Sequence, residues 1–453
     1  MDRAWARKLT LPFAAAGGLC LAAAAAVCVT LDRGTIPARV GVACVLLALA
    51  GLALALLRKE GADRERLLLL LLPVGAAVLA RALCLDYVSG DYQDFLAGWV
   101  DYFRDNGGFS AIAEPVGNYN VPYLYFLALI SCLPIPDLYL IKLFSIAFDV
   151  ILAWGGLRLV RAVRRKGADD PAPWAAFAVL LLLPTVVLNG AYWAQCDSVY
   201  GALTVLAAAL VLEGRNKTSV ALMAVAFSFK LQTVFVLPLW GVLWLARRVK
   251  FRQLWVFPGV YLLTILPALL LGKPLGDILG IYFSQAAQYP RLTLNAPSVY
   301  QFLPYGTEDA SGILSAAGIA AAAMLVLALL GVGLWQGRRL DRGQVLAVAV
   351  VLAIGVPFLL PHMHERYFFL ADVLTVCWAC VQARRAPAAV LVCGSSLASY
   401  VVYLRLKFNA VIYLGGNSYP MLLEALAMLA ALVFSGAALA RSLIRRRGEE
   451  ERE

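Results

Sequence analysis

The sequence predicts an all-α, polytopic membrane protein. Hydrophobic residues make up 62% of the 453 positions and charged residues only 15%, which lies outside the range of soluble domains. The apolar residues form runs long enough for a helix to cross a bilayer, and short basic clusters flank these runs. The formal charge of +11 is therefore distributed as an orientation signal, which argues against nucleic acid as a partner.

About fourteen spans are expected, because a bilayer core of about 30 Å needs roughly 17 to 25 apolar residues per helix, and fewer where protein shields the helix. We place them at residues 9–30, 38–57, 66–85, 138–160, 174–190, 198–213, 218–230, 233–247, 253–271, 312–335, 343–360, 367–383, 387–404 and 419–441. The first run is longer than the apolar part of a usual signal peptide, which favours a retained span. Residues 123–134 are apolar but short and lie between prolines, so an interfacial or dipping helix is expected there.

Basic residues return at every second loop when the N-terminus is placed in the cytoplasm. The cytoplasmic segments are then RKEGADRER, RAVRRKGADD, EGRNK, ARRVKFRQ, GRRLDRG, QARRA and the tail RSLIRRRGEEERE. Both termini of this plasma (inner) membrane protein would be cytoplasmic. The unusual polar clusters would all face the extracytoplasmic side: DYVSGDYQDF, NGAYWAQCD, FSFKLQ, QYPRLTLNAPSVYQF and HMHERY.

The first large outer loop, GDYQDFLAGWVDYFRDNGG, is predicted to form an amphipathic helix on the membrane surface. In a helix its acidic residues share one face and bulky apolar residues share the other. The acidic residues are Asp91, Asp94, Asp101 and Asp105, and the apolar ones are Tyr92, Leu96, Trp99 and Phe103. A solvated acidic face would explain Asp101 and Asp105, whereas Asp91 and Asp94 lie closest to the membrane and are candidates for chemistry.

Ionisable residues also lie within or at the edges of the predicted spans, where a charge is costly unless it is paired or faces a cavity. They are Arg81, Lys142, Asp149 and Lys230. The three basic side chains could instead extend to the interface from the outer ends of their spans. Asp149 lies two helical turns from Lys142, so a structural pair between these two is expected.

The segment HMHERY contains both histidines of the chain, His362 and His364, beside Glu365 and Arg366. Alternating histidines suggest zinc, but no third ligand lies at metal spacing and Arg366 would repel a cation. Imidazole and guanidinium groups both donate to phosphoryl oxygens, so phosphate binding fits better. No metal and no other cofactor is expected.

The remaining sequence signals are weaker. Gln195 and Asp197 lie at the outer end of a predicted span, where Asp197 or Ser198 could act only as a helix N-cap. The nine cysteines lie mostly in apolar runs, so they do not resemble a disulfide framework. Cys377 and Cys380 form a CxxC within an apolar run, where they are expected to pack as buried thiols.

Neither a GxxxxGK[ST] loop nor a soluble GxGxxG unit is present, so nothing in the sequence is suited to hold a nucleotide. A carboxylate loop opposite imidazole, Arg and Lys suits an acceptor that must lose a proton and a donor that leaves as phosphate. The sequence therefore favours glycosyl transfer from a lipid phosphate. A transporter or flippase of a lipid-linked glycan is the alternative, but it would show two similar halves, and no such repeat is present. A structural membrane subunit, the third alternative, would not need polar clusters on one face.

The order and spacing of GDYQDF, NGAYWAQCDSVYGALTVLA, AFSFKLQTVFVLPL, LTLNAPSVYQFLP and HMHERYFFLADVL resemble those of bacterial integral-membrane mannosyltransferases related to the second GPI mannosyltransferase. More distantly, the chain is similar to the dolichyl-phosphate-glucose glucosyltransferases of the N-glycan pathway, which have Lys where this chain has Arg366. Both groups are GT-C glycosyltransferases, and the resemblance covers about Arg81 to Tyr403. It implies a GT-C helical bundle, inverting transfer from a polyprenyl-phosphate sugar, a catalytic base at Asp91, and a donor phosphate near His364, Glu365 and Arg366.

Together these arguments predict extra spans in residues 1–65, a GT-C-like catalytic membrane domain in residues 66–404, and an outer loop, last span and tail in residues 405–453. Asp91 is the expected base, and Asp94 is expected to orient the acceptor or to share its charge. The acceptor would be a lipid-linked glycan, a polysaccharide or a protein. The residues expected to bind the donor phosphate are His364, Arg366, Glu365, His362 and Lys230. Those expected to shape the substrate pocket are Gln195, Asp197, Gln232, Arg291, Asn295 and Arg81.

Overall fold

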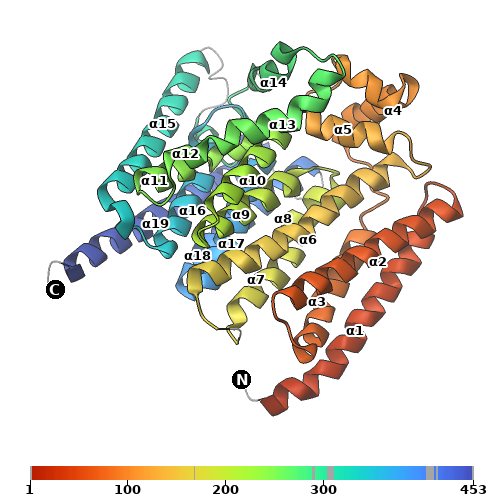
Figure 1. Ribbon diagram of the computed structural model, residues 1–453, viewed down its shortest axis with the longest axis horizontal. Helices are drawn as coiled ribbons and strands as arrows, with labels where there is room; N and C mark the ends of the chain where they lie inside the picture. Colours follow the sequence, from red (N-terminus) through yellow and green to blue (C-terminus); the bar gives the residue numbers. More distant parts are fainter. Residues whose placement is uncertain are drawn as a thin grey trace.

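A computed structural model describes residues 3–167, 169–287, 291–303, 311–404, 413–414 and 417–450. The described chain is helical except for two sheets of two short strands each, so the predicted all-α class is confirmed (Figure 1). One continuous cluster of buried apolar side chains reaches from Ala24 near the N-terminus to Leu443 near the C-terminus.

The first half of the chain contains the acidic loop and the helices before and after it. They are α1 (Arg3–Val29), α2 (Ile36–Lys59), α3 (Arg64–Ala82), η1 (Tyr92–Leu96), α4 (Ala97–Asp105), η2 (Gly108–Ala113), α5 (Val121–Ile130), α6 (Asp137–Arg164), α7 (Pro171–Leu182), α8 (Pro184–Val187), η3 (Leu188–Tyr192), α9 (Asp197–Leu212) and α10 (Asn216–Phe229).

The second half of the chain contains the remaining helices and the two small sheets. Its elements are η4 (Leu231–Phe235), α11 (Pro238–Leu245), α12 (Phe251–Leu254), α13 (Val256–Leu270), α14 (Leu275–Ala287), β1 (Thr293–Leu294), η5 (Val299–Phe302), α15 (Ser311–Gln336), η7 (Gly337–Arg339), α16 (Arg342–Leu359), β2 (Met363–His364), η8 (Glu365–Phe368), α17 (Phe369–Val381), η9 (Ala383–Arg385), α18 (Ala386–Leu404), β3 (Tyr413–Leu414), β4 (Asn417–Ser418) and α19 (Tyr419–Glu450).

Helix α6 is central to the packing, since α7 and α9 lie along it and α2 contacts it from the N-terminal side (Figure 1). Helix α1 packs closely on α3, because glycines face each other where the two helices meet. A Cβ at Gly17 would lie 2.4 Å from the Leu71 oxygen, and one at Gly75 would lie 2.4 Å from the Gly17 oxygen. Backbones of membrane helices approach this closely only where small residues meet.

The predicted number of spans is wrong. Within the described residues, eight helices are long and apolar enough to cross a membrane, and the bent pair Pro171–Leu182 and Pro184–Tyr192 would make a ninth. The other predicted spans correspond to α9, α10, α11 and α17, with 16, 14, 8 and 13 residues, and to α3, which carries charges near both ends. A 16-residue helix is about 24 Å long, whereas the hydrocarbon core is about 30 Å thick. Neighbouring helices bury α9 and α17 almost completely, so their apolar composition reflects a protein interior.

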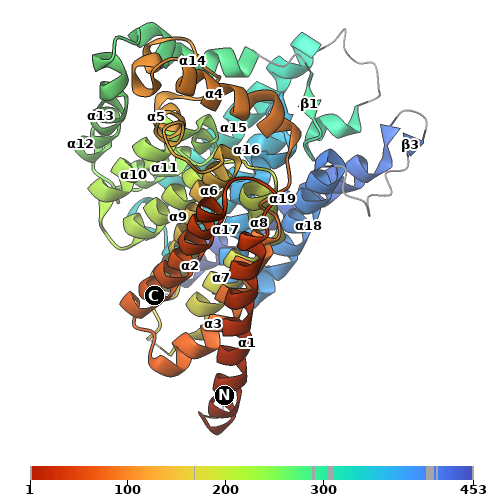
Figure 2. The ribbon, with the colours of Figure 1, turned by 90° about the vertical axis from the view of Figure 1, so that its right-hand side faces the viewer.

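The basic segments meet at one end of the bundle. The contacts that join them are the ion pairs Arg161–Glu60 and Arg158–Glu213, and the hydrogen bonds from Arg164, Arg342, Asn216 and Gln344 to the backbone oxygens of Val381, Ala162, Arg248 and Ser442. Figures 1 and 2 show both termini on the side of the bundle away from α4, α5 and α14.

The acidic loop lies at the other end of the bundle. The Tyr92 hydroxyl donates to Asp137 Oδ2 at 3.0 Å, and Asp137 is the first residue of α6, whose 28 residues end at Arg164 among the basic segments. The two ends are therefore about 42 Å apart along this helix. The loop is helical as predicted, but it starts with a π-helical turn, η1, before α4. The apolar stretch 123–134 is confirmed as too short to span, since α5 has only 10 residues.

Candidate functional site

A cavity of about 260 Å³ opens at the end of the bundle that carries the acidic loop. Its wall combines segments that are far apart in the sequence: residues 91–99, 118–119, 195, 294–295, 364–366 and 403. The predicted site residues that line it are Asp91, Asp94, Gln195, Asn295, His364, Glu365 and Arg366. The structure thus brings together most of the side chains that the sequence singled out.

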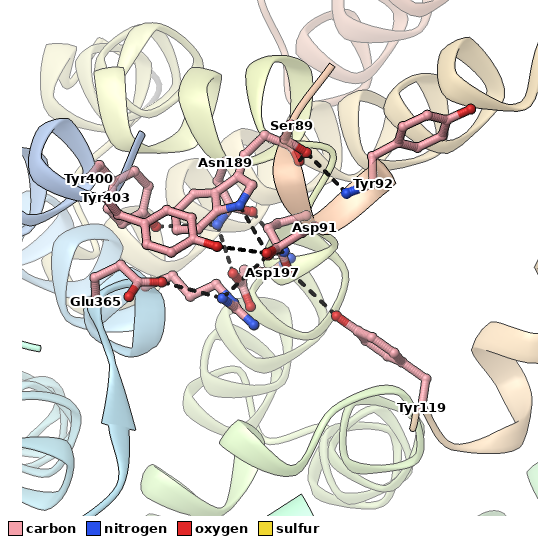
Figure 3. Close-up of polar contacts among 12 residues, drawn as sticks. Ser89, Asp91, Tyr92, Tyr119, Asn189, Asp197, Glu365, Tyr400 and Tyr403 are labelled. Carbon is pink, nitrogen blue, oxygen red and sulfur yellow. Dashed lines mark hydrogen bonds and ion pairs between the residues drawn. The ribbon is translucent and has the colours of Figure 1, made fainter. Parts of the chain in front are cut away.

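The carboxylate of Asp91 is held by donors on several sides (Figure 3). Tyr403 donates its hydroxyl to Oδ1 at 2.7 Å, Trp193 donates its indole N–H to Oδ2 at 3.1 Å, and Gln195 donates its amide to Oδ2. The Arg366 guanidinium lies 3.7 Å from Oδ2. The Asp91 side chain remains 17% exposed, so this oriented carboxylate is still open to the cavity.

The loop that leads to Asp91 is fixed on both sides. Lys142 on α6 donates to the backbone oxygens of Cys84, Leu85 and Tyr87 at 2.8, 2.9 and 2.7 Å. Ser89 donates its hydroxyl to the Trp193 backbone oxygen at 2.6 Å and accepts from the Tyr92 backbone N–H at 3.2 Å. Both segments that orient the carboxylate contain π-helical turns, η1 and η3, and such turns are frequent at functional sites.

Arg366 is the cation that faces the cavity. Its Nη1 lies 3.3 Å from Glu365 Oε1, and its guanidinium lies 5.5 Å from the centre of the Trp193 ring. Its Nε is buried and has no hydrogen-bond partner among the described residues. The guanidinium therefore keeps donor capacity for a ligand anion.

Burial changes the protonation of the residues beside Arg366. Burial, reinforced by Arg366 and Lys230, lowers the pKa of His364 from 6.5 to about 2, so this imidazole is neutral. Burial raises the pKa of Glu365 from 4.5 to about 7, although Arg366 acts in the other direction. Perturbed ionisable groups of this kind are concentrated at functional sites.

A short parallel ladder joins the two outer loops that carry polar motifs. Thr293 pairs with Met363 and Leu294 pairs with His364, which brings LTLNAPSVYQF against HMHERY. Asn295 and His362 both have positive φ, 55° and 63°, a conformation that costs a non-glycine residue roughly 1 to 3 kcal/mol and is common at binding sites.

His362 and Arg291 are not among the residues that line the cavity. Nδ1 of His362 is 2.7 Å from the Arg291 backbone oxygen, so the imidazole joins the two loops. The Arg291 side chain is exposed. Neither residue is placed to touch a ligand that occupies the cavity itself.

Asp197 and Lys230 form a buried ion pair beside the cavity. Asn189 donates to the other carboxylate oxygen of Asp197 at 2.7 Å, and the Lys230 ammonium lies 5.8 Å from the centre of the Tyr119 ring. Gln232 is buried next to Tyr367. These side chains support the wall, and the charge of Lys230 is already compensated.

Arg81 does not belong to the pocket, so its predicted role is wrong. Its Nε donates to Asp149 Oδ2 at 2.9 Å, and its side chain is 1% exposed. The predicted pair of Asp149 with Lys142 is also wrong, because Lys142 binds backbone oxygens and Ser198 donates to the second oxygen of Asp149. The partner of Asp149 lies on another helix, where spacing along α6 could not reveal it.

Asp94 and the more distal acids differ in position. Asp94 lines the cavity and is exposed, whereas Asp101 forms an exposed ion pair with Arg104.

In the described part of the chain, no three His, Cys, Asp or Glu side chains are grouped as metal ligands. The nine cysteines, each in a described segment, are free thiols.

Several aromatic residues of the site were not singled out by the sequence. Tyr403 is at the end of an apolar run and directly between Val402 and Leu404, and Tyr119 lies in a loop. Trp193 had a signal, because it precedes Gln195 in the polar turn AYWAQCD. Its ring stacks on Tyr403 at 4.7 Å between centroids, so these aromatic side chains form one face behind Asp91.

The fold and the cavity define a multi-pass helical membrane protein with charged and aromatic side chains gathered at one end of its bundle. A scan against protein-family models found no matching family, and searches of curated proteins and of solved structures found no similar protein.

Proposed function

We propose that this protein is an inverting, GT-C-type membrane glycosyltransferase that moves a hexosyl group, such as mannosyl, from a polyprenyl phosphate to an acceptor. The acceptor would be a lipid-linked glycan, a polysaccharide or a protein. One observation carries the proposal: an oriented, partly exposed carboxylate, Asp91, lies 3.7 Å from a guanidinium with free donor capacity, in one cavity. A base for a hydroxyl and a binding group for a phosphate are the two requirements of this reaction.

The proposed step needs no further reactant. The acceptor hydroxyl oxygen bonds to the anomeric carbon while the bond from that carbon to the phosphate oxygen breaks and the phosphate keeps the electron pair. Asp91 accepts the hydroxyl proton. Arg366 binds the departing phosphate through its guanidinium group, and the neutral imidazole of His364 lies in the same wall of the cavity.

The orientation follows from the distribution of charge. Basic segments favour the cytoplasmic side, and here they meet at the end of the bundle away from the cavity. In this orientation both termini are cytoplasmic and the cavity faces the extracytoplasmic side of the plasma membrane. Nucleotide sugars are made in the cytoplasm, so a donor at this cavity must be carried across on a lipid.

The test is turnover by purified protein in lipid nanodiscs. The protein is incubated with a panel of polyprenyl-phosphate hexoses and a glycan acceptor, and the released polyprenyl phosphate is measured by mass spectrometry. General-base catalysis contributes roughly a factor of 100 to 10,000, so Asp91→Asn is expected to lower turnover at least 100-fold with near-normal donor binding. Asp105→Asn, at the exposed last residue of α4, is the matched control and is expected to retain activity.

Arg366→Ala distinguishes phosphate binding by Arg366 from proton acceptance by Asp91. Loss of a phosphate contact is expected to weaken donor binding as well as turnover. Robust transfer from a nucleotide sugar alone, or full activity in both Asp91→Asn and Arg366→Ala, would refute the proposal. Movement of a lipid-linked glycan across the bilayer without release of lipid phosphate would instead support a flippase.

A further inference from the structure

A second cavity, of about 360 Å³, lies next to the first. It is lined by residues 115–117, 119–121 and 124 on one side and by residues 273, 276–278, 280–281 and 284 on the other, most of which belong to α14. Figures 1 and 2 show α14 at the same end of the bundle as α4 and α5. The cavity is therefore on the side of the molecule that carries the candidate site.

Tyr119 belongs to the walls of both cavities. Its hydroxyl donates to Gln195 Oε1 at 3.5 Å, and Gln195 in turn donates to Asp91. The neighbouring residue Asn118 lines the first cavity, while Asn120 lines the second. One short segment of chain thus separates the proposed base from the second cavity.

Helix α14 has two distinct faces. Leu275, Leu279 and Phe283 lie on one face and are 46%, 46% and 80% exposed, as expected for a helix whose apolar side meets lipid at the membrane surface. Gly276, Asp277, Gly280 and Ser284 lie on the face that lines the cavity. A Cβ at Gly276 or Gly280 would meet no atom within 4 Å, so the two glycines leave this cavity open.

The charges of the second cavity differ from those of the first. Lys273 is the only cation among its described lining residues, and its ammonium already donates to the backbone oxygens of Ile112 and Glu114 at 3.2 and 2.7 Å. Asp277 presents an exposed carboxylate. A carboxylate repels phosphate but accepts hydrogen bonds from hydroxyl groups, and Tyr119 adds an aromatic wall. The chemistry suits a neutral sugar.

The volumes of the two cavities also indicate that the second one binds a separate substrate. Cavities that bind small molecules usually measure about 300 to 1,000 Å³, so the first cavity, at about 260 Å³, is too small for two substrates. A transferase must place two substrates side by side. The second cavity supplies the missing space within reach of the same wall residue.

We propose that the second cavity binds the acceptor as a neutral glycoside, with its hydroxyl directed past Tyr119 toward Asp91, and that α14 holds this cavity at the lipid surface. This inference rests on the proposed function, because it assigns the second substrate of the same reaction. It also makes a claim about binding that can be measured without turnover.

The kinetic test uses Gly280→Leu, which fills the cavity from a helical position where Leu is a better helix former than Gly. With a polyprenyl-phosphate hexose and octyl hexosides as acceptors, the KM for the octyl hexoside is expected to rise at least tenfold. The KM for the donor is expected to stay within twofold. Gly331→Leu, at an exposed glycine of α15 whose Cβ would also meet nothing within 4 Å, is the matched control. An unchanged acceptor KM, or an equal rise in both KM values, would overturn the assignment.

The binding test separates failure of the inference from failure of the proposed function. In Ser284→Cys protein, octyl hexosides are expected to protect position 284 from a maleimide, measured on the corresponding peptide by mass spectrometry. Octyl phosphate, with the same chain and an anionic headgroup, is expected not to protect. Absence of protection by any octyl hexoside would refute the inference, whether or not transfer occurs. Protection without transfer by the unmodified protein would retain the glycoside site and refute the glycosyltransferase.

Discussion

Replacing Arg81 by methionine is expected to destabilise the protein strongly, because it leaves the Asp149 carboxylate buried without its cation. The two side chains are 1% and 0% exposed and are joined at 2.9 Å. Arg81 also donates to the Leu181 backbone oxygen at 2.9 Å. Removal of one member of a buried pair costs about 3 to 5 kcal/mol, and the unbonded carbonyl places Arg81→Met toward the upper part of that range.

The free energy of unfolding is measured by denaturant titration in detergent micelles. Arg104→Met is the matched control, because it breaks an Arg–Asp pair with Asp101 whose side chains are 44% and 60% exposed. Exposed pairs contribute about 0 to 1 kcal/mol, so this control is expected to change stability little. The double variant Arg81→Met/Asp149→Asn removes the uncompensated charge and is expected to recover at least half of the loss.

Two results would refute this reasoning. If Arg81→Met costs no more than Arg104→Met, the buried pair does not stabilise the fold. If the double variant is no more stable than Arg81→Met, then the loss comes from packing or from the carbonyl contact rather than from the buried charge.

Three further predictions concern the site and its orientation. Gly117→Ala is expected to lower the free energy of unfolding by about 1 to 3 kcal/mol, because φ is +66° and the new Cβ would lie 2.9 Å from the Trp99 ring. Gly98→Ala, where a Cβ meets no atom within 4 Å, is the control. Equal stability of the two variants would contradict the prediction. The raised pKa of Glu365 favours the folded state at low pH, and this contribution is lost as the pH rises from 4.5 through about 7. The denaturant midpoint of Glu365→Gln is therefore expected to fall less than that of the unmodified protein over this interval. Parallel plots of midpoint against pH for the two proteins would exclude a role for this carboxyl group. In a variant from which the nine native cysteines have been removed, an impermeant thiol reagent added to cells is expected to modify a cysteine placed at the exposed residue Gln93 and not one at Lys166. The reverse pattern would invert the proposed topology.

The sequence predicts which loops meet at the cavity, because the positions of the basic segments indicate which loops lie at the same end of the helical bundle. Once the basic segments were assigned to one side, GDYQDF, AYWAQCD and HMHERY had to emerge together on the other. The structure adds what no pattern could supply. Residues 293–294 pair with 363–364, and Tyr403 reaches Asp91 across 312 positions of the sequence.

The wrong number of spans and the wrong role for Arg81 have a common physical cause. A hydropathy pattern reports whether a side chain avoids water, and it does not distinguish lipid from a protein interior. Helix α17 is apolar except for Asp372 and Thr375 because other helices surround its 13 residues, and its sequence therefore resembles that of a span. The same limit applied to Arg81: its position near the end of a run could not show whether the guanidinium reached the interface or turned inward to another helix.

The three hydrogen bonds of Lys142 determine which wall of the cavity is held most firmly. Backbone carbonyls near a membrane carry a large penalty when they lack a donor, so a single ammonium that serves three of them is hard to replace by any rearranged loop. The segment before Asp91 therefore moves only if α6 moves with it. The opposite wall has fewer such contacts, because a ladder of only two residue pairs joins residues 294–295 to residues 364–366, and we expect any opening of the cavity to occur there. A spin label on that wall would report such motion, while one placed beside Asp91 would serve as the fixed reference.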